Sequence, residues 1–484
     1  MNKNNLLIFA FTFTCLVALA QKKPLHSEKP NIIVIFTDDH GFADLGVQGQ
    51  LSDVKTPYID QMAKEGVRMT SGYITAPQCT PSRAGLLTGR YQQRFGLDEN
   101  GTIPLPLEEL IIPERMKEAG YTTGMTGKWH LEPNHIEKEW IAENMPELVG
   151  KKVKHSDIPF SKKLSYMPSE RGFDDCFQGE MIRYWVNYDL DGNDVKKQHI
   201  VDKRFRLDVQ TDAALTFIDR NHDTPFFFYL SYYGPHVPLE ATSYYLNRFP
   251  EEMPERRRYA LAMLAAIDDG VGAVRKSLEE YGILDNTIIF FIADNGAPLK
   301  IEKKDLMPIN YPRASWDGSL NDPYIGEKGM LSEGGIRVPF IVSWPEKLPK
   351  GMTYDRPVSS LDMSATSIAV AGLPKSEELD GVNLIPFLNG DKTEDPHENL
   401  FWRFWDQSAV RTGDFKYLKA GSREFLFNVA NDDHENVNLI TDYPKQAKAM
   451  KKKLELWAGE LKKTGLSNKL KREKNWFDHY FKEK

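Results

Sequence analysis

Four short stretches of the chain are almost continuously apolar and rich in β-branched or aromatic residues. They are Asn31–Phe36, Phe226–Leu230, Thr287–Ile292 and Phe340–Ser343. A run of this kind is typical of a strand that is buried on both faces, as in a parallel sheet covered by helices. The pattern therefore predicts a sheet at the centre of the molecule rather than one with a face in water.

Amphipathic helical patterns lie between these strands. Apolar residues recur with helical spacing over Leu110–Ala119, Val209–Asn221 and Tyr259–Tyr281. Strands that alternate with helices indicate an α/β domain. We therefore predict an α/β fold with a large, mostly parallel sheet sandwiched by helices.

The pattern changes beyond about residue 390. Short strand-like pieces separated by polar turns span Gln407–Arg411, Phe415–Leu418 and Phe425–Asn428, and a Lys-rich amphipathic helix follows over Pro444–Lys463. This order predicts a small antiparallel sheet with a packed helix. The charged tail Lys469–Lys484 is expected to be solvated and only partly ordered.

The N-terminus has the layout of a secretory signal peptide. Lys3 precedes an apolar stretch from Leu6 to Leu19, and Ala18-Leu19-Ala20 offers a cleavage site. The stretch is short for a membrane span, although an uncleaved N-terminal anchor is the alternative. We expect a signal peptide at residues 1–20, export to the periplasm or the medium, and no stable membrane insertion.

Composition narrows the function further. The chain has 62 Lys and Arg against 69 Asp and Glu, a formal net charge of −7 that argues against a nucleic-acid partner. After removal of the signal peptide, Cys79 and Cys176 would remain, and these two could form a disulfide. An isolated disulfide is not needed in a domain of this size, and a lone thiol is a liability in an oxidising compartment. Cys79 therefore needs another explanation.

Acidic residues follow two of the predicted strands directly. Asp38 and Asp39 come after the first strand, and Asp294 and Asn295 come after the strand at 287–292. Ligands of open α/β sheets gather at the carboxyl ends of strands, so the two pairs could converge. Three carboxylates and an amide oxygen suit Ca²⁺ or Mg²⁺ rather than zinc. Either pair alone would more often be a helix cap or a turn.

The segment Cys79–Arg90 reads as a short helix. Pro81 and Ser82 suit a helix start and Gly89 suits its end, so Cys79 would lie just before the helix N-terminus. That position favours anionic oxygens, and Arg83 could reach back to it. The alternative is a capped helix with an incidental cysteine.

Three more segments hold candidate polar residues. If Gly124–His130 is extended, Lys128 and His130 share one side of the chain, which would suit an anion pocket. His236 lies between two prolines, which restrict the backbone around it, and Lys328 lies in a Gly-rich loop. Each residue alone could equally be a surface lysine or a loop histidine.

The segment Cys79–Arg90 also matches C-x-P-S-R-x-x-x-L-x-G-R at every specified position. This is the signature of type I, formylglycine-dependent sulfatases, and the resemblance extends from about Lys29 to about Asp414. It implies an alkaline-phosphatase-like fold with a sulfatase catalytic domain at 21–390. Residues 391–484 would form a C-terminal subdomain with an antiparallel sheet and a helix.

The resemblance implies a role for each matching residue. Cys79 would be oxidised to Cα-formylglycine (3-oxoalanine) by a formylglycine-generating or an anaerobic sulfatase-maturing enzyme, and its hydrate would be the nucleophile. One Ca²⁺ would be held by Asp38, Asp39, Asp294, Asn295 and an oxygen of residue 79. Arg83, Lys128 and Lys328 would stabilise charge on the sulfate and on the nucleophile. His130 would be the base of the later elimination, and His236 the acid for the leaving oxygen. Glu333 and Arg337 would support the site structurally.

Two rivals stay open at this point, a phosphonate or phosphate monoesterase of the same superfamily and an inactive relative that binds sulfated glycans. By analogy with exported relatives we expect a sulfated poly- or oligosaccharide as substrate, such as the algal glycans ulvan or carrageenan. The segments expected to line its pocket are Glu180–His199 with Arg183, Tyr184 and Trp185, Leu299–Tyr324 with Lys303, Arg313 and Trp316, and the aromatic residues of Phe401–Trp405.

Overall fold

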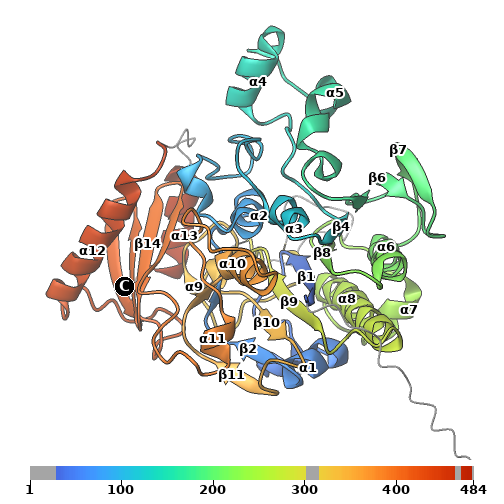
Figure 1. The fold of residues 1–484 in the computed structure, drawn as a ribbon. Coiled ribbons are helices and arrows are strands. Elements are labelled where there is room, and N and C mark those ends of the chain that lie inside the picture. The colour runs from blue at the N-terminus through green and yellow to red at the C-terminus, as the bar shows by residue number, and fades with distance from the viewer. Residues whose placement is uncertain (1–28, 301–315, 464–469, 482–484) are drawn as a thin grey trace, which may run out of the picture.

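The computed structural model describes residues 29–300, 316–463 and 470–481 (Figure 1). Most of these residues surround a ten-stranded sheet with the order β11-β2-β10-β9-β1-β8-β4-β5-β6-β7. Its strands are β1 (Asn31–Asp38), β2 (Val67–Met69), β4 (Thr122–Gly127), β5 (Asp175–Gln178), β6 (Arg183–Tyr188), β7 (Asp194–Val201), β8 (Phe226–Pro235), β9 (Thr287–Ala293), β10 (Phe340–Ser343) and β11 (Met352–Tyr354). A short second pair joins β3 (Gly72–Tyr73) to β12 (Val358–Ser359). The predicted signal peptide lies outside the described residues.

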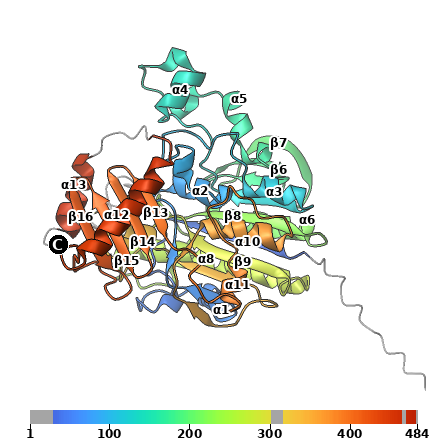
Figure 2. The ribbon, with the colours of Figure 1, turned by 60° about the vertical axis from the view of Figure 1, so that its left-hand side comes forward.

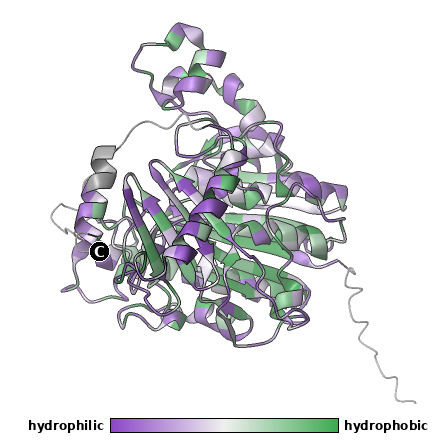
Figure 3. Ribbon diagram, turned by 90° about the vertical axis from the view of Figure 1, so that its left-hand side faces the viewer, coloured by the Kyte–Doolittle hydropathy of each residue, from purple (hydrophilic) through white to green (hydrophobic). Residues whose placement is uncertain are grey.

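The centre of the sheet is parallel and buried on both faces. β1 pairs in parallel with β8 on one side and with β9 on the other. Beyond β8, the parallel pairing extends to β4 and then to β5. Alternate residues of β1 enter opposite apolar clusters, with Ile32 and Val34 on one face and Ile33 and Ile35 on the other. The hydropathy colouring shows these central strands in green (Figure 3). The predicted α/β class and mostly parallel sheet are confirmed.

One of the four predicted strands runs the other way. β10 pairs antiparallel with β9, although its apolar run resembles those of the parallel strands. A parallel partner needs a crossover connection, usually a helix, on one face of the sheet. The described part of the chain between β9 and β10 contains only the one-turn helix α9 (Glu333–Ile336), so the strand returns antiparallel.

Helices cover both faces of the sheet. Residues of α2 and α3 share one apolar cluster with β1, and residues of α1, α6 and α8 share the cluster on the opposite face. The helices of this part are α1 (Pro57–Lys64), α2 (Cys79–Thr88), α3 (Ile112–Glu118), α6 (Arg206–Asn221), α7 (Ser243–Leu246), α8 (Glu255–Glu280), α10 (Leu361–Val370) and α11 (Ile385–Leu388). Within the described residues, no helix has the length and apolar composition that a bilayer crossing requires.

A four-stranded antiparallel sheet follows, as predicted. It consists of β13 (Leu400–Phe404), β14 (Gln407–Thr412), β15 (Phe415–Ala420) and β16 (Arg423–Asn428) in sequence order. Helix α12 (Pro444–Gly459) lies against one face of this small sheet (Figure 2). Its Met450 and Trp457 are buried there with residues of the strands. The position of the boundary at residue 390 stays a prediction.

The expectation of a solvated C-terminal tail is wrong. Residues Leu470–Tyr480 form helix α13, and Trp476, Phe477 and Phe481 are buried in the main apolar cluster. The Trp476 ring stacks on Trp405, and Phe481 packs against Phe425. Aromatic burial on the second face of the small sheet outweighs the cost of ordering a charged segment.

Residues 131–170 form a protrusion above the carboxyl edge of the large sheet (Figure 1). It contains α4 (Lys138–Asn144) and α5 (Phe160–Lys163), separated by short 3-10 turns. Trp140, Ile141 and Ile158 belong to a small apolar cluster of its own. The sequence analysis did not predict these elements.

Candidate active site

The two acidic pairs meet at the carboxyl edge of the large sheet. The backbone N–H of Asp39, after β1, donates a hydrogen bond of 3.0 Å to Oδ1 of Asp294, after β9. Nδ2 of Asn295 donates to Oδ1 of Asp39 at 2.7 Å. Because β1 and β9 are parallel neighbours, residues 256 positions apart in sequence become contacts.

Backbone geometry turns both adjacent carboxylates toward one place. In an extended strand, Asp38 and Asp39 would point to opposite faces of the sheet. Asp39 has φ of +58°, in the left-handed region that Asp tolerates better than most residues. The strand therefore ends in a sharp turn. Both carboxylates form ion pairs there, Asp38 with Lys128 and Asp39 with Lys328.

Helix α2 carries the cysteine into this cluster. Sγ of Cys79 lies 3.4 Å from Oδ1 of Asp38 and 3.1 Å from Nζ of Lys328. The helix begins at Cys79 itself, two residues before the start that Pro81 and Ser82 indicated, and ends at Gly89 in a left-handed conformation as predicted. Both described cysteines, Cys79 and Cys176, are free buried thiols, so no disulfide joins them.

Arg83 lies beneath the carboxylates, one helical turn after the cysteine. Its guanidinium is fully buried and pairs with Asp294 at 3.1 Å and with Asp38 at 3.6 Å. The other terminal nitrogen donates to the Ser231 hydroxyl at 2.5 Å and to the Tyr229 hydroxyl at 3.2 Å. With both terminal nitrogens bonded to protein groups, Arg83 holds the carboxylates in place.

Lys128 and His130 follow the end of β4, so the segment Gly124–His130 is extended only as far as Gly127. β4 ends at Gly127, where φ is +91° and a Cβ would lie 1.9 Å from the backbone oxygen of Ser231. Nζ of Lys128 pairs with Asp38 at 2.5 Å. His130 has φ of +61°, and its buried Nδ1 has no hydrogen-bond partner.

Lys328 and His236 complete the cluster from two loops. Nζ of Lys328 pairs with Oδ1 of Asp39 at 2.5 Å, and Nε2 of His236 lies 3.5 Å from Oδ2 of the same residue. Nδ1 of His236 donates to the backbone oxygen of Val237, which leaves Nε2 directed at the cluster. We call the whole set the site cluster; it consists of Asp38, Asp39, Cys79, Arg83, Lys128, His236, Asp294, Asn295 and Lys328.

Burial and mutual charge shift the pKa values of the acidic groups in different directions. Burial, followed by the charge of Asp294, raises the pKa of the Cys79 thiol far above its usual range. Burial also raises the pKa of Asp294, to about 7, with Asp38 as the next cause. Burial opposes ionisation of Asp38 as well, but Lys128, His236 and Arg83 outweigh it and hold its pKa well below the ordinary value.

Both histidines are held neutral by their surroundings. Burial lowers the pKa of His236 to about 4, although Asp38 and Asp39 act in the opposite direction. Burial and then Lys128 and Arg83 bring the pKa of His130 well below its ordinary value. An added negative charge at the cluster would favour the protonated form of either ring.

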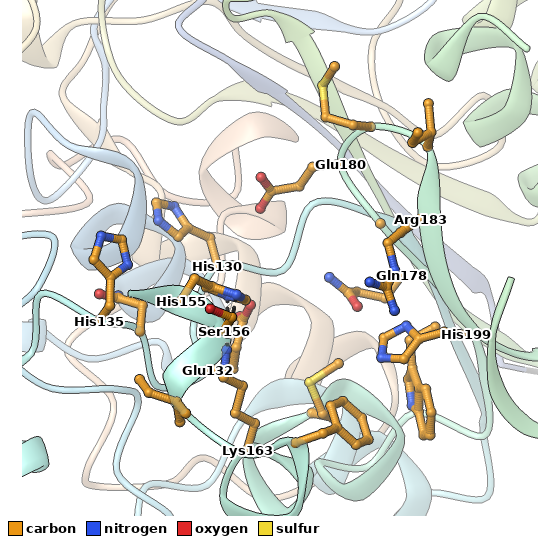
Figure 4. Close-up of a pocket in the computed structure, with 18 of the residues that line it drawn as sticks. His130, Glu132, His135, His155, Ser156, Lys163, Gln178, Glu180, Arg183 and His199 are labelled. Atoms are coloured by element: carbon orange, nitrogen blue, oxygen red, sulfur yellow. Dashed lines mark hydrogen bonds between the residues drawn. The ribbon is translucent and has the colours of Figure 1, made fainter. Parts of the chain in front are cut away.

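A cavity of about 730 Å³ lies at His130, two residues after Lys128 of the site cluster (Figure 4). His130 lies on its wall, together with Glu180 from the loop after β5 and Arg183 and Trp185 from β6. The protrusion at 131–170 supplies the opposite wall, which the sequence analysis missed; its members include Glu132, His135, His155, Phe160 and Lys163. The only prior signal was a polar stretch with scattered histidines.

Several predicted pocket residues lie elsewhere. Tyr184 is fully buried and donates its hydroxyl hydrogen to the Met181 backbone oxygen, because β6 alternates its side chains between cavity and core. Trp316 is buried in a small apolar cluster, and Trp402 donates to the Ile74 backbone oxygen inside the main core. Lys303 and Arg313 lie outside the described residues.

Glu333 and Arg337 lie in a second buried cluster of charge. Oε1 of Glu333 pairs with Lys416 of β15 at 2.9 Å, and Oε2 pairs with Arg337 at 3.2 Å and accepts the Tyr73 hydroxyl hydrogen at 2.5 Å. We call these four residues the bridging cluster, because they join the large sheet region to the small sheet. The contacts agree with the structural role expected for Glu333 and Arg337.

Comparison with known proteins gives the class. A family model described as Sulfatase matches residues 30–373, and one described as N-sulphoglucosamine sulphohydrolase, C-terminal, matches residues 325–462. The chain belongs to the sulfatase family. It is therefore a sulfuric ester hydrolase.

Relatives and solved structures agree with this assignment. This sulfatase is 32% identical over 407 residues to N-acetylgalactosamine-6-sulfatase of Mus musculus, covering 80% of this chain and 72% of that protein. It is 30% identical over 449 residues to the uncharacterized sulfatase YdeN of Escherichia coli K12, covering 84% and 75%. A crystal structure of Ps i-CgsB in complex with k-i-k-neocarrahexaose superposes with a TM-score of 0.73 at 29% identity, covering 93% and 97%.

The fold is also shared beyond sulfatases. The phosphonate monoester hydrolase of Agrobacterium radiobacter superposes with a TM-score of 0.60 at 20% identity, covering 90% of this chain and 96% of that one. The alkaline-phosphatase-like fold expected from the resemblance is thereby confirmed.

Proposed function

We propose that this exported sulfatase removes sulfate from a sulfated poly- or oligosaccharide, with Cys79 converted to formylglycine and one Ca²⁺ bound beside it. The observation that carries the proposal is the position of Cys79 at the start of α2, between the Asp38 carboxylate and the Lys328 ammonium group. A nucleophile placed there would meet a substrate sulfate among fixed cations.

The unmodified thiol is poorly suited to attack. The thiolate is the reactive form of cysteine, and burial with neighbouring carboxylates strongly favours the neutral thiol of Cys79. An oxygen nucleophile derived from this side chain would not need that ionisation. The electrostatics therefore support conversion of Cys79 before catalysis, by a dedicated maturation enzyme.

The donor set fits calcium. Asp38, Asp39 and Asp294 offer hard carboxylate oxygens, and the buried Oδ1 of Asn295 has no hydrogen-bond partner. His236 lies within the same group of potential ligands, but Ca²⁺ prefers oxygen, so we assign the imidazole to proton transfer. When bound, the ion and the formylglycine hydrate would supply a polarised sulfate and the attacking oxygen.

The protein's own residues would do the rest. Arg83 orients Asp38 and Asp294, and Lys128 and Lys328 place two ammonium groups where the sulfate oxygens would lie. His236 presents Nε2 toward the cluster and would protonate the leaving oxygen once the sulfate charge favours its cationic form. His130, which lines the cavity and whose buried Nδ1 has no hydrogen-bond partner, would accept a proton in the second half of the reaction.

The substrate class rests on the cavity and the comparisons. Trp185 and Phe160 form an aromatic pair on the cavity wall, at 4.6 Å between ring centroids, and such surfaces stack against sugar rings. The similar Ps i-CgsB structure holds a neocarrahexaose, and the mouse relative is named for a sulfated amino sugar. Both support a sulfated carbohydrate for this chain, with carrageenan and ulvan oligosaccharides as the first candidates.

The proposal is tested on protein co-expressed with a formylglycine-generating enzyme. Mass spectrometry of the peptide that contains residue 79 should show a loss of about 18 Da relative to cysteine. Sulfate release should then be measured from carrageenan and ulvan oligosaccharides with Ca²⁺ present and after chelation. Unmodified Cys79 in a fully active enzyme, or activity that survives chelation, would overturn the formylglycine and calcium assignments respectively.

The phosphomonoesterase alternative is decided in the same experiment. An aryl sulfate and the matching aryl phosphate present the same leaving group to the site. We expect hydrolysis of the sulfate to dominate, and faster release of phosphate would reverse the assignment.

A further inference from the structure

Two carboxylates on the cavity wall have no part in the mechanism above. Glu132 follows His130 in the loop after β4, and Glu180 follows β5 by two residues. β4 and β5 are parallel neighbours, so both loops leave the same edge of the sheet. Figure 4 shows both side chains at the cavity that contains His130, with the Glu180 carboxylate directed into it.

Neither carboxylate has a directly bonded cationic partner among the described residues. Within that part of the chain, Lys163 acts on Glu132 and Lys128 acts on Glu180 only through longer-range charge, and the buried Oε2 of Glu132 has no hydrogen-bond partner. A buried acceptor without a partner costs stability. In a cavity wall, such an acceptor is satisfied when a ligand brings a donor.

The electrostatics agree with close approach of the two groups. Burial raises the pKa of Glu132, and the charge of Glu180 is the next cause. Burial also raises the pKa of Glu180, against the opposing effect of Lys128. Glu180 therefore lies within electrostatic reach of both Lys128 in the site cluster and Glu132 at the start of the protrusion.

We propose that Glu132 and Glu180 form an acceptor subsite for the sugar that carries the reacting sulfate. The subsite binds hydrogen-bond donors of that sugar, hydroxyl or ammonium groups, and excludes a second sulfate from the same ring. This inference rests on the proposed function, because it assumes that a sulfated sugar occupies the cavity. It sets two carboxylates beside the lysines of the site cluster that would take the reacting sulfate, on a cavity whose lining also includes Lys163 and Arg183.

The test compares monosulfated with disulfated forms of one sugar. Substrates are the monosulfates and disulfates of methyl galactoside and methyl glucoside, with the monosulfates of methyl glucosaminide for the ammonium case. The wild type, Glu132→Gln, Glu180→Gln and the double variant are assayed for sulfate release. Glu143→Gln on the exposed side of α4 removes the same charge outside the cavity and serves as the control.

The wild type should favour the monosulfate in kcat/KM by about tenfold or more, because a second sulfate would face two like charges. Each cavity variant should reduce that preference, the double variant most, whereas Glu143→Gln should leave it unchanged. Preference for the glucosaminide would identify ammonium as the donor, and preference for the neutral sugars would identify hydroxyl. Equal rates for mono- and disulfates in the wild type would overturn the subsite.

Binding measurements keep the test independent of turnover and of variant folding. Calorimetry with the Cys79→Ser protein compares the affinities for the same pairs, and equal affinity or no binding counts against the subsite. Release of sulfate without selectivity would be a failure of the subsite alone. Absence of release from every probe and from the polysaccharide-derived oligosaccharides, with formylglycine verified at residue 79, would be a failure of the proposed function.

Discussion

The site cluster and the bridging cluster are both built from buried acidic and basic side chains, yet they differ in how their charges are matched. In the bridging cluster, Glu333 and Lys416 have no exposed side-chain surface, and both oxygens of Glu333 are engaged. In the site cluster, the side chains of Lys328 and His236 are 17% and 21% exposed. One network is closed, and the other is partly exposed to solvent.

The pKa values express the same difference. Burial disfavours the charge of Glu333, but Lys416 and Arg337 outweigh it and hold its pKa at about 2. Asp294 has a buried cationic partner as well, and its pKa is nevertheless raised to about 7. Cations of the protein thus keep Glu333 ionised in the bridging cluster, whereas Asp294 in the site cluster keeps a raised pKa that a cation bound beside it would lower.

The largest expected effect is loss of activity when a residue of the site cluster is changed. Cys79→Ser should lower kcat by a factor on the order of 10⁴ to 10⁶, the range seen when a nucleophile is removed. The thermal midpoint should change little, because the replacement is close in size. Cys176→Ser is the matched control, since Cys176 is also a free buried thiol on β5 and should keep its activity. Comparable losses in both variants would contradict a special role for Cys79.

A substitution in the bridging cluster should instead lower the free energy of unfolding. Lys416→Met leaves Glu333 buried without its lysine partner, and breaking a buried ion pair from one side costs about 3–5 kcal/mol. Lys419→Met on the exposed side of the same strand should cost far less. Denaturant unfolding measures both, and kcat/KM measured well below the midpoint should equal that of the wild type. Unchanged stability in Lys416→Met would show that the bridging cluster does not hold the two sheets together.

Parts of the site cluster were predictable because the ends of two predicted strands mark its position. Continuous apolar runs identify β1 and β9, and parallel pairing brings Asp38 and Asp294 together whatever lies between them. The helix at Cys79 and its glycine end were visible in local sequence as well. Local signals and one topological rule were sufficient here.

The bridging cluster and the cavity wall depend on contacts between residues far apart in sequence, which no local pattern indicates. Lys416 reads as a solvated strand residue, and its partner Glu333 lies 83 positions away on another element. The protrusion at 131–170 places Lys163 and His155 on the cavity wall through a small apolar cluster without strong periodicity. The tail helix was missed because its charge was given more weight than Trp476 and Phe477.

Calcium offers a third way to separate the clusters. A ligand that binds only the folded state stabilises it by about 2.7 kcal/mol at a concentration 100 times its Kd. Adding Ca²⁺ to the chelated enzyme should therefore raise the thermal midpoint, and Asp294→Asn should abolish that rise. Asp191→Asn, in the turn before β7 and far from the site cluster in sequence, should keep it. If Ca²⁺ does not change the thermal midpoint of the wild type, the site cluster does not bind the ion.

The smallest expected effect comes from an ion pair that belongs to neither cluster. Nε2 of His397 lies 2.8 Å from Oδ1 of Asp362 at the start of α10, with 8% of the His397 side chain exposed. Burial lowers the pKa of His397, but Asp362 outweighs it and raises the value above the ordinary 6.5.

A histidine with a raised folded pKa adds stability that is fully present below the unfolded value and is lost as the pH rises through the folded value. The stability of the wild type should thus decline from about pH 6.5 upward by on the order of 1 kcal/mol more than that of His397→Gln, the usual scale of one hydrogen-bonded pair. Urea midpoints measured at intervals from pH 5.5 to about pH 9 would test this, because the two curves should run parallel at acid pH and converge as the imidazole of the wild type loses its proton. Curves that stay parallel throughout would mean that His397 does not titrate in this window. The contrast between a closed, self-neutralised cluster and an open one would then rest on the activity and calcium measurements, without support from an independently titrating pair.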